Sequence, residues 1–129
     1  MEVEVSAPID RPVAEVWDFY AVHHVENHPR WDPSIELEAT SDGPIGVGTV
    51  IKRRVDRFGK VTEGRMEIVE FDTERAMRVR TQDGTMTING WMLCEPLADD
   101  RTLLRIGAEF PGLDESLADP IRSMMERSV

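Results

Sequence analysis

Residues 66–110 read MEIVEFDTERAMRVRTQDGTMTINGWMLCEPLADDRTLLRIGAEF, and they carry the clearest pattern in the sequence. Its apolar residues occupy alternate positions in successive segments that turns separate. Met77 and Val79, for example, share one side of a segment whose other side carries Arg78 and Arg80. A period of two is typical of β-strands with one face on a core and the other toward water. The stretch therefore predicts an antiparallel sheet with an apolar inner face.

The predicted inner face is rich in methionine. It holds Met66, Ile68, Met77, Val79, Met86, Ile88, Met92, Cys94, Leu104 and Ile106. Glu70 has the same parity as Met66 and Ile68, but it lies near the end of its segment, where exposure is expected. Because methionine side chains are flexible and polarizable, they can repack around ligands of varied shape, or they can simply fill a core. Both interpretations stay open on this pattern.

The composition indicates one domain, residues 1–129, rather than two. Acidic residues outnumber basic ones by 25 to 15, the formal charge is −10, and the basic residues are dispersed. Nucleic acid and anionic membranes are therefore not expected partners. Cys94 stands alone, so no intramolecular disulfide can form, and its inward parity predicts a small buried side chain. No leader and no run of ~20 apolar residues occurs, so we expect a soluble cytoplasmic protein without stable membrane insertion.

The chain is predicted to hold about seven strands and three helices. The strands are expected at Val3–Val5, Ile35–Ala39, Val50–Val55, Val61–Phe71, Met77–Thr81, Met86–Cys94 and Leu103–Phe110. Asp10 stands at the expected N-cap of a first helix, whose apolar stripe runs from Val13 to Tyr20. Asp83-Gly84 is expected in a hairpin turn, and residues 119–129 form a last helix with one apolar face.

Two histidines have a spacing that zinc sites use. His24 and His28 are four residues apart and can share one face of a helical turn. A third ligand is not evident nearby, and Pro29 is expected to end the turn at once. We therefore expect no metal, and a solvated, partly capping role for both histidines.

Residues 43–48, GPIGVG, are superficially similar to a glycine-rich phosphate loop. A dinucleotide loop needs a preceding parallel strand and a following helix, whereas Thr49 to Val55 reads as a strand. The glycines are better explained as a connection between two antiparallel strands, so no cofactor is expected.

Four local segments occur in the order typical of one known superfamily. They are Ala7–Pro12 followed by Val16-Trp17, then Asn27–Pro33, Gly46–Thr49, and Cys94–Leu97 followed by Thr102. Together with the order of one strand, two short helices, six strands and a last helix, they make the chain resemble the START-like, or helix-grip, superfamily. The branch it resembles most is the polyketide cyclase/dehydrase and lipid-transport group. The resemblance implies an α+β fold, with a curved antiparallel sheet, a C-terminal helix across its concave face, and a hydrophobic ligand between them.

The last helix is shorter than this resemblance implies. Eleven residues from Asp119 to Val129, at ~1.5 Å each, reach only about 16 Å. Three interpretations stay open: the pocket is open at one end, it is closed by a partner subunit, or it is cut short in this chain.

Few titratable groups can be placed on the inner face. Arg53 turns inward if Ile51 and Val55 do, and its guanidinium could then polarize a carbonyl or pair with a carboxylate. The opposite register, with Lys52 inward, fits the pattern equally well. His28 has the most suitable intrinsic pKa for acid/base chemistry, but its place in a helical turn favours exposure.

The leading hypothesis is a protein that binds a small hydrophobic molecule in an apolar cavity. The residues expected to form that site are Tyr20, Trp31, Arg53, Met66, Met77, Met86, Ile88, Leu117 and Met124. A second hypothesis is an enzyme for aldol-type cyclization or dehydration, with Arg53 or His28 as the polar agent. Two or more polar groups converging inside the pocket would favour this hypothesis. A third is an interaction module whose open groove takes a hydrophobic segment, in its simplest form a homodimer.

Overall fold

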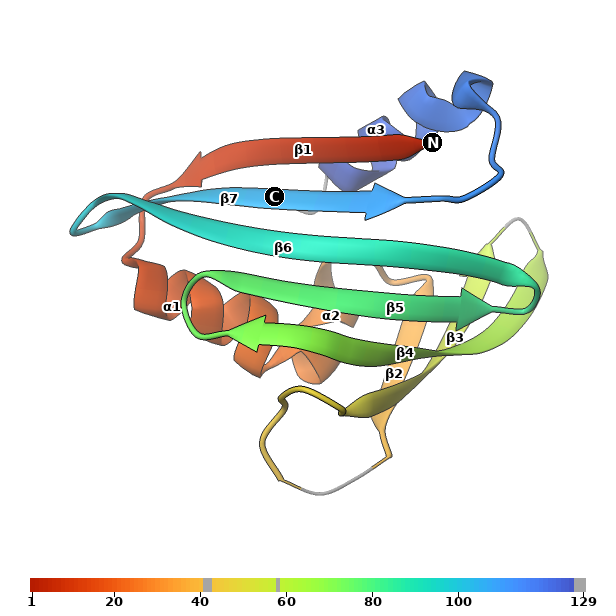
Figure 1. Cartoon of the computed structure of the whole chain (residues 1–129), viewed down its shortest axis with the longest axis horizontal. Coiled ribbons are helices and arrows are strands. Elements are labelled where there is room, and N and C mark those ends of the chain that lie inside the picture. Colours follow the sequence, from red (N-terminus) through yellow and green to blue (C-terminus); the bar gives the residue numbers. More distant parts are fainter. Residues whose placement is uncertain (41–42, 58, 127–129) are drawn as a thin grey trace.

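The computed structural model describes residues 1–40, 43–57 and 59–126, and for Trp31, Arg57 and Met124 it describes the backbone only. Seven strands form one open antiparallel sheet in the order β1-β7-β6-β5-β4-β3-β2 (Figure 1). They are β1 (Glu2–Ile9), β2 (Ile35–Ala39), β3 (Val50–Arg57), β4 (Lys60–Asp72), β5 (Ala76–Asp83), β6 (Met86–Ala98) and β7 (Arg101–Glu109). All seven predicted strands are confirmed.

The helices lie before β2 and after β7. Helix α1 (Val13–Trp17) continues into a π-helical turn, η1 (Asp18–Val22), and α2 (His24–Trp31) follows. His23 separates η1 from α2 because its backbone leaves the helical conformation, with φ −104° and ψ 36°. The 3-10 turn η2 (Glu115–Leu117) leads into α3 (Ala118–Glu126). The prediction that Pro29 ends its helix is wrong, since Pro29 lies inside α2.

The first helix begins later than the sequence pattern predicts. Pro12, with an extended backbone (φ −60°, ψ 151°), occupies the N-cap position, and no side chain caps the helix. Asp10 instead accepts a hydrogen bond from Nε of Arg101, the first residue of β7, at 2.9 Å. The Asp10 carboxylate therefore joins two distant segments rather than capping a helix.

The main core lies between the α1–η1 helix and the inner face of the sheet. Trp17 is buried, and its ring centroid is 5.1 Å from that of Phe71. Ile51, Ile68 and Leu104 are at most 1% exposed. Cys94 is buried among these residues, as its parity predicts. The alternation of the sequence thus translates directly into a packed inner face.

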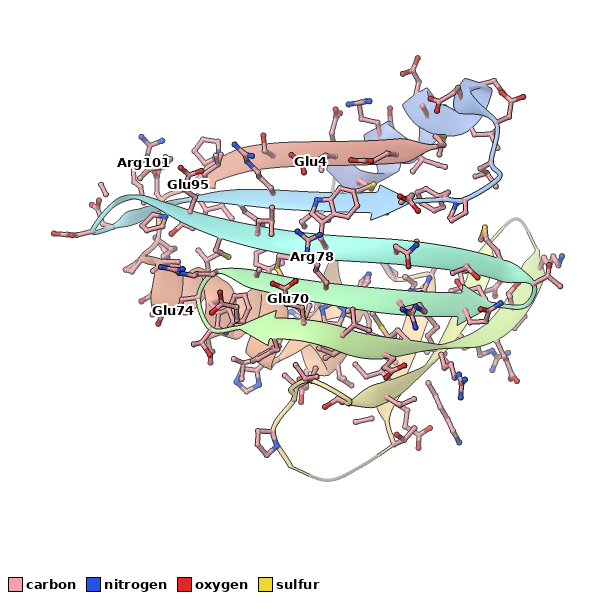
Figure 2. All side chains as sticks on the ribbon, in the orientation of Figure 1. Glu4, Glu70, Glu74, Arg78, Glu95 and Arg101 are labelled. Atoms are coloured by element: carbon pink, nitrogen blue, oxygen red, sulfur yellow. The ribbon has the colours of Figure 1, made fainter. Side chains whose placement is uncertain are left out.

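A register shift between Ile68 and Glu70 changes the parity of β4. Beyond it Phe71 lies opposite Met77 and packs on the core, while Glu70 lies opposite Arg78. Glu70 Oε2 is 2.9 Å from Arg78 Nε on the outer face, where both are about half exposed (Figure 2). The parity shared by Glu70 and Ile68 in the sequence is therefore broken by a β-bulge, and the expected exposure of Glu70 is confirmed.

Helix α3 packs beside β1 at one edge of the sheet (Figure 1). Arg122 Nη1 is 3.5 Å from the carbonyl oxygen of Glu4, and Met125 is half-buried on the side of the inner face. Over the described part of the chain, no helix combines the length and the apolar character needed to span a bilayer.

Candidate ligand-binding site

A cavity of about 200 Å³ remains between the inner face of the sheet and the helices. Its apolar wall comes mainly from β4 to β7 and includes Met66, Met77, Val79, Ile88, Met92, Ile106 and Ala108. Tyr20 from η1 and Met125 from α3 border it from the helical side. The methionines of the sheet therefore have two roles: Met66, Met77 and Met92 belong to the core and also form the cavity wall.

The structure brings five of the nine expected site residues to the cavity. These are Tyr20, Arg53, Met66, Met77 and Ile88. The side chains of Trp31 and Met124 lie outside the described residues. Met86 and Leu117 do not line the cavity: Met86 is 36% exposed at the start of β6, and Leu117 is 44% exposed in η2. Both have suitable parity or spacing, but Met86 is the first residue of β6 and Leu117 lies in the turn before α3.

Arg53 faces inward, which settles the register that the sequence leaves undecided. Its neighbours Ile51 and Val55 are buried. Arg53 Nε donates to both carboxylate oxygens of Asp83, at 2.9 Å and 3.1 Å. The Arg53 and Asp83 side chains are only 9% and 6% exposed. The sequence pattern placed Asp83 in a hairpin turn, but Asp83 ends β5 opposite Met86, and Gly84, with φ +61°, begins the turn.

Gly64 makes this ion pair possible. It lies on β4 directly between Arg53 on β3 and Asp83 on β5. Neighbouring strands are about 4.8 Å apart, so the arginine must reach across a whole strand to meet the carboxylate. A Cβ at position 64 would lie 2.1 Å from the Gln82 carbonyl oxygen and 2.3 Å from Asp83 Oδ1. Only glycine leaves room for this contact.

His24 is buried and His28 is half-buried, whereas the sequence-based expectation was that both are solvated. His24 is 7% exposed, His28 is half-buried, and both line the cavity. His24 Nδ1 lies 3.0 Å from the Tyr20 carbonyl oxygen, and His28 Nδ1 lies 3.1 Å from His24 Nε2. The expectation failed because it took residues 23–28 for a surface turn, whereas α2 packs against β2 and continues beyond Pro29.

Burial sets the protonation of the groups around the cavity. It lowers the pKa of His24, and the nearby positive charge of Arg53 lowers this pKa further. The hydrogen bond to the Tyr20 carbonyl partly opposes both effects. It raises the pKa of the Tyr20 phenol, and the proximity of Cys94 raises it further. Burial also raises the pKa of Cys94 to about 11. At neutral pH these three groups are uncharged, so Cys94 is not a ready nucleophile.

The cavity thus has an apolar wall and a polar end. The polar end combines the guanidinium of Arg53, the imidazoles of His24 and His28, and the carboxylate of Asp32. Arg53 contacts Asp83 through Nε. Among the described residues, none accepts a hydrogen bond from Arg53 Nη1 or Nη2. Those N–H groups can donate to an oxygen atom of a ligand.

Comparison with known proteins identifies the family. Residues 1–129 match the model of the family described as "Polyketide cyclase / dehydrase and lipid transport". The chain belongs to this family. No curated protein matches the sequence.

Solved structures of other proteins share the fold of this polyketide cyclase/dehydrase family member. Ara h 8.0201 superposes with a TM-score of 0.76 at 18% identity, over 98% of this chain and 90% of that one. For the ZhuI aromatase/cyclase from Streptomyces sp. R1128 the TM-score is 0.71 at 19% identity, over 98% and 82%. For ginseng major latex-like protein 151 from Panax ginseng it is 0.73 at 16% identity, over 98% and 91%. At these identities the likeness shows the fold alone.

Proposed function

We propose that this family member binds a small, mostly apolar molecule in the cavity between the sheet and the helices. The observation that carries the proposal is the cavity itself, which persists beside a core whose central side chains are at most a few percent exposed. An engineered cavity of about 150 Å³ is enough to hold benzene. A site of about 200 Å³ therefore suits a molecule of one or two rings, with any larger part reaching out of the cavity.

The polar end gives such a ligand an orientation. Burying a carbonyl or hydroxyl oxygen without a hydrogen bond costs several kcal/mol at most and about 1–3 kcal/mol typically. An oxygen placed next to the Arg53 guanidinium avoids this cost, while the remainder of the molecule contacts Met66, Met77 and Ile88. Because Asp83 already balances the charge of Arg53, a neutral oxygen group fits this end better than a carboxylate.

The test is a titration with prodan, a neutral two-ring ketone whose fluorescence shifts to the blue when it leaves water. Ile88→Trp adds a large side chain to the cavity wall and should weaken binding at least about tenfold, while the folded structure is retained. Val47→Trp, at a loop position that is 68% exposed, is the matched control and should bind as the natural chain does. Absence of a blue shift with the natural chain, or equal binding by both variants, would count against the proposal.

A second candidate is an enzyme that catalyses aldol cyclization or dehydration of such a ligand. The observation that favours it is the convergence of Arg53, His28 and Tyr20 on one cavity. An arginine can stabilise the negative charge that develops on a carbonyl oxygen, and a neutral histidine can accept the proton from an enolizable carbon. To test this candidate, a short poly-β-ketone thioester is incubated with the natural chain or with Arg53→Met, and the products are identified by chromatography with mass detection. Cyclization at the spontaneous rate with the natural chain would rule against it.

A further inference from the structure

Two threonines are buried in the described part of the chain, and their hydroxyl groups differ in what they contact. Thr102 is 0% exposed, and its Oγ1 donates to the Arg11 carbonyl oxygen at 2.9 Å. Thr81 is 3% exposed, and its hydroxyl forms no hydrogen bond with any of the described residues. Buried hydroxyl groups normally have a partner, so the hydroxyl of Thr81 needs another explanation.

The hydroxyl of Thr81 is open to the cavity. Among the described residues, only Trp17 Nε1 is both fully enclosed and without a hydrogen-bond partner. Because the Thr81 hydroxyl has no partner there either, it is not fully enclosed. Thr81 is shielded from bulk solvent and lines the cavity, so the cavity is the open space that its hydroxyl borders.

Thr81 interrupts an apolar row on the inner face. Met66 on β4 and Ile88 on β6 lie directly opposite it on the two adjacent strands. Val79, two residues earlier on β5, also lines the cavity. Valine has the same branched shape as threonine and no hydroxyl group to desolvate. Packing of this row therefore gives no reason for a hydroxyl, whereas a polar group on a molecule in the cavity does.

Arg53 and Thr81 face the cavity from neighbouring rows of the sheet. Arg53 and Asp83 belong to the row that crosses Gly64, and Thr81 precedes Asp83 by two residues on the same face of β5. Two residues of a strand span about 7 Å. This separation is comparable to the length of a two-ring molecule, so one ligand can contact Arg53 at one end and Thr81 at the other.

We propose that Thr81 is a ligand-binding residue, and that the cavity takes an apolar ring system that carries two oxygen groups, one bound by Arg53 and the other by Thr81. The inference rests on the proposed ligand-binding function and adds the class of ligand. Arg53 can only donate, so the oxygen beside it must accept. A hydroxyl can donate or accept, so Thr81 suits either a hydroxyl or a carbonyl group on the ligand. A ligand with one oxygen leaves one of the two residues unpaired.

The first experiment is calorimetry with three naphthalenes that differ in a second hydroxyl group. In the natural protein the tighter-binding isomer of 2,6- and 2,7-dihydroxynaphthalene should bind about fivefold more tightly than 2-naphthol, the value of one neutral hydrogen bond. In Thr81→Val neither diol should bind more tightly than 2-naphthol, whose own affinity should be unchanged. Thr81→Ser keeps the hydroxyl and should keep the preference. Thr85→Val, at an exposed turn position, is the matched control and should behave as the natural protein does.

The second experiment measures urea unfolding without ligand, which separates binding from a structural role. Thr81→Val replaces an unpaired hydroxyl by a methyl group in an apolar row, so the urea midpoint should stay the same or rise. Thr102→Val removes a hydroxyl that is paired with the Arg11 carbonyl, so its midpoint should fall. A lower midpoint for Thr81→Val, or its failure to fold, would show that the hydroxyl stabilises the protein itself and would overturn the inference.

This inference and the proposed function fail in different ways. If 2-naphthol binds but neither diol binds more tightly, the second oxygen has no partner in the cavity, and the inference is wrong while ligand binding stands. If the preference for a diol persists in Thr81→Val, another residue binds the second oxygen and the role of Thr81 is wrong. If none of the naphthalenes binds and prodan does not bind, ligand binding itself is wrong, and this inference falls with it.

Discussion

The inner and outer faces of the sheet each carry an arginine–carboxylate pair with the same closest distance. Arg53 Nε lies 2.9 Å from Asp83 on the inner face, and Arg78 Nε lies 2.9 Å from Glu70 on the outer face (Figure 2). The inner side chains are 9% and 6% exposed, and the outer ones are 46% and 47% exposed. Distance alone would rank the two pairs as equal. Their surroundings make one an essential part of the cavity end and the other a screened surface contact.

The two pairs also differ in how the chain builds them. Glu70 and Arg78 are directly opposite each other on adjacent strands, so the hairpin between β4 and β5 brings them together. Arg53 and Asp83 are 30 residues apart and lie on strands separated by β4, so their contact depends on the space above Gly64. A local pair forms wherever the hairpin forms, whereas the inner pair requires three strands in the correct register.

The largest expected effect comes from breaking the inner pair. Asp83→Ala leaves the Arg53 guanidinium buried without its counter-charge, and we expect a loss of about 3–5 kcal/mol in the free energy of unfolding measured with urea. The matched change on the outer face, Glu70→Ala, should cost about 0–1 kcal/mol, since water and salt screen that pair. Similar losses in both variants would show that burial does not distinguish the two faces.

The next effect comes from filling the space between the inner partners. Gly64→Ala places a methyl group where the Gln82 carbonyl oxygen and the Asp83 carboxylate now lie, so the Arg53 contact must be displaced. We expect a cost of about 2–4 kcal/mol in the same measurement. Gly46→Ala is the control, because a Cβ there meets no atom within 4 Å and the backbone is free of positive φ. Equal melting temperatures for the two alanine variants would contradict the role assigned to Gly64.

The smallest effect is a pH dependence that arises on the inner face. Because burial lowers the pKa of His24 below its ordinary value of 6.5, the unfolded chain binds a proton near pH 6 that the folded chain does not. Stability due to His24 is therefore complete above pH 6.5 and falls as the pH drops from 6.5 toward the folded-state pKa. One proton accounts for a slope of at most about 1.4 kcal/mol per pH unit.

His24→Asn should remove this contribution, so the difference between variant and natural protein isolates it from the carboxylates. Urea unfolding at several pH values between 5 and 7.5 is the measurement. His23→Asn is the control, because His23 is exposed, with about half of its side chain in contact with water. Parallel pH profiles for His24→Asn and the natural protein would show that His24 has no lowered pKa in the folded state.

The sequence was most informative about the wall of the cavity. Met66, Met77 and Ile88 could be placed on the inner face because alternation is a local property of a strand, read two residues at a time. Parity alone fails at the bulge after Ile68, which moves Glu70 to the outer face, whereas the position of Glu70 near the end of its segment predicted its exposure correctly. Parity and spacing do not show that a residue at the end of an element is exposed, and Met86, the first residue of β6, and Leu117, in the turn before α3, lie outside the cavity.

The polar end could not be derived from the sequence in the same way. The alternation in β3 fits Arg53 or Lys52 inward equally well, and only the pairing with β2 and β4 decides between them. Nothing in the spacing of Arg53, Gly64 and Asp83 shows that they form one row across three strands. The burial of His24 and the half-buried position of His28 likewise depend on how α2 packs, and the expectation that Pro29 ends the helix did not predict that packing.

The amino-acid sequence alone specifies the number of strands, the face on which most apolar residues of the sheet lie, and the family of the fold, because these follow from short-range periodicity and local segments in a fixed order. The tertiary structure alone decided which polar groups meet at the end of the cavity. Those contacts depend on strand register and on the space left by a glycine, and both are set by the packing of residues that are far apart in the chain.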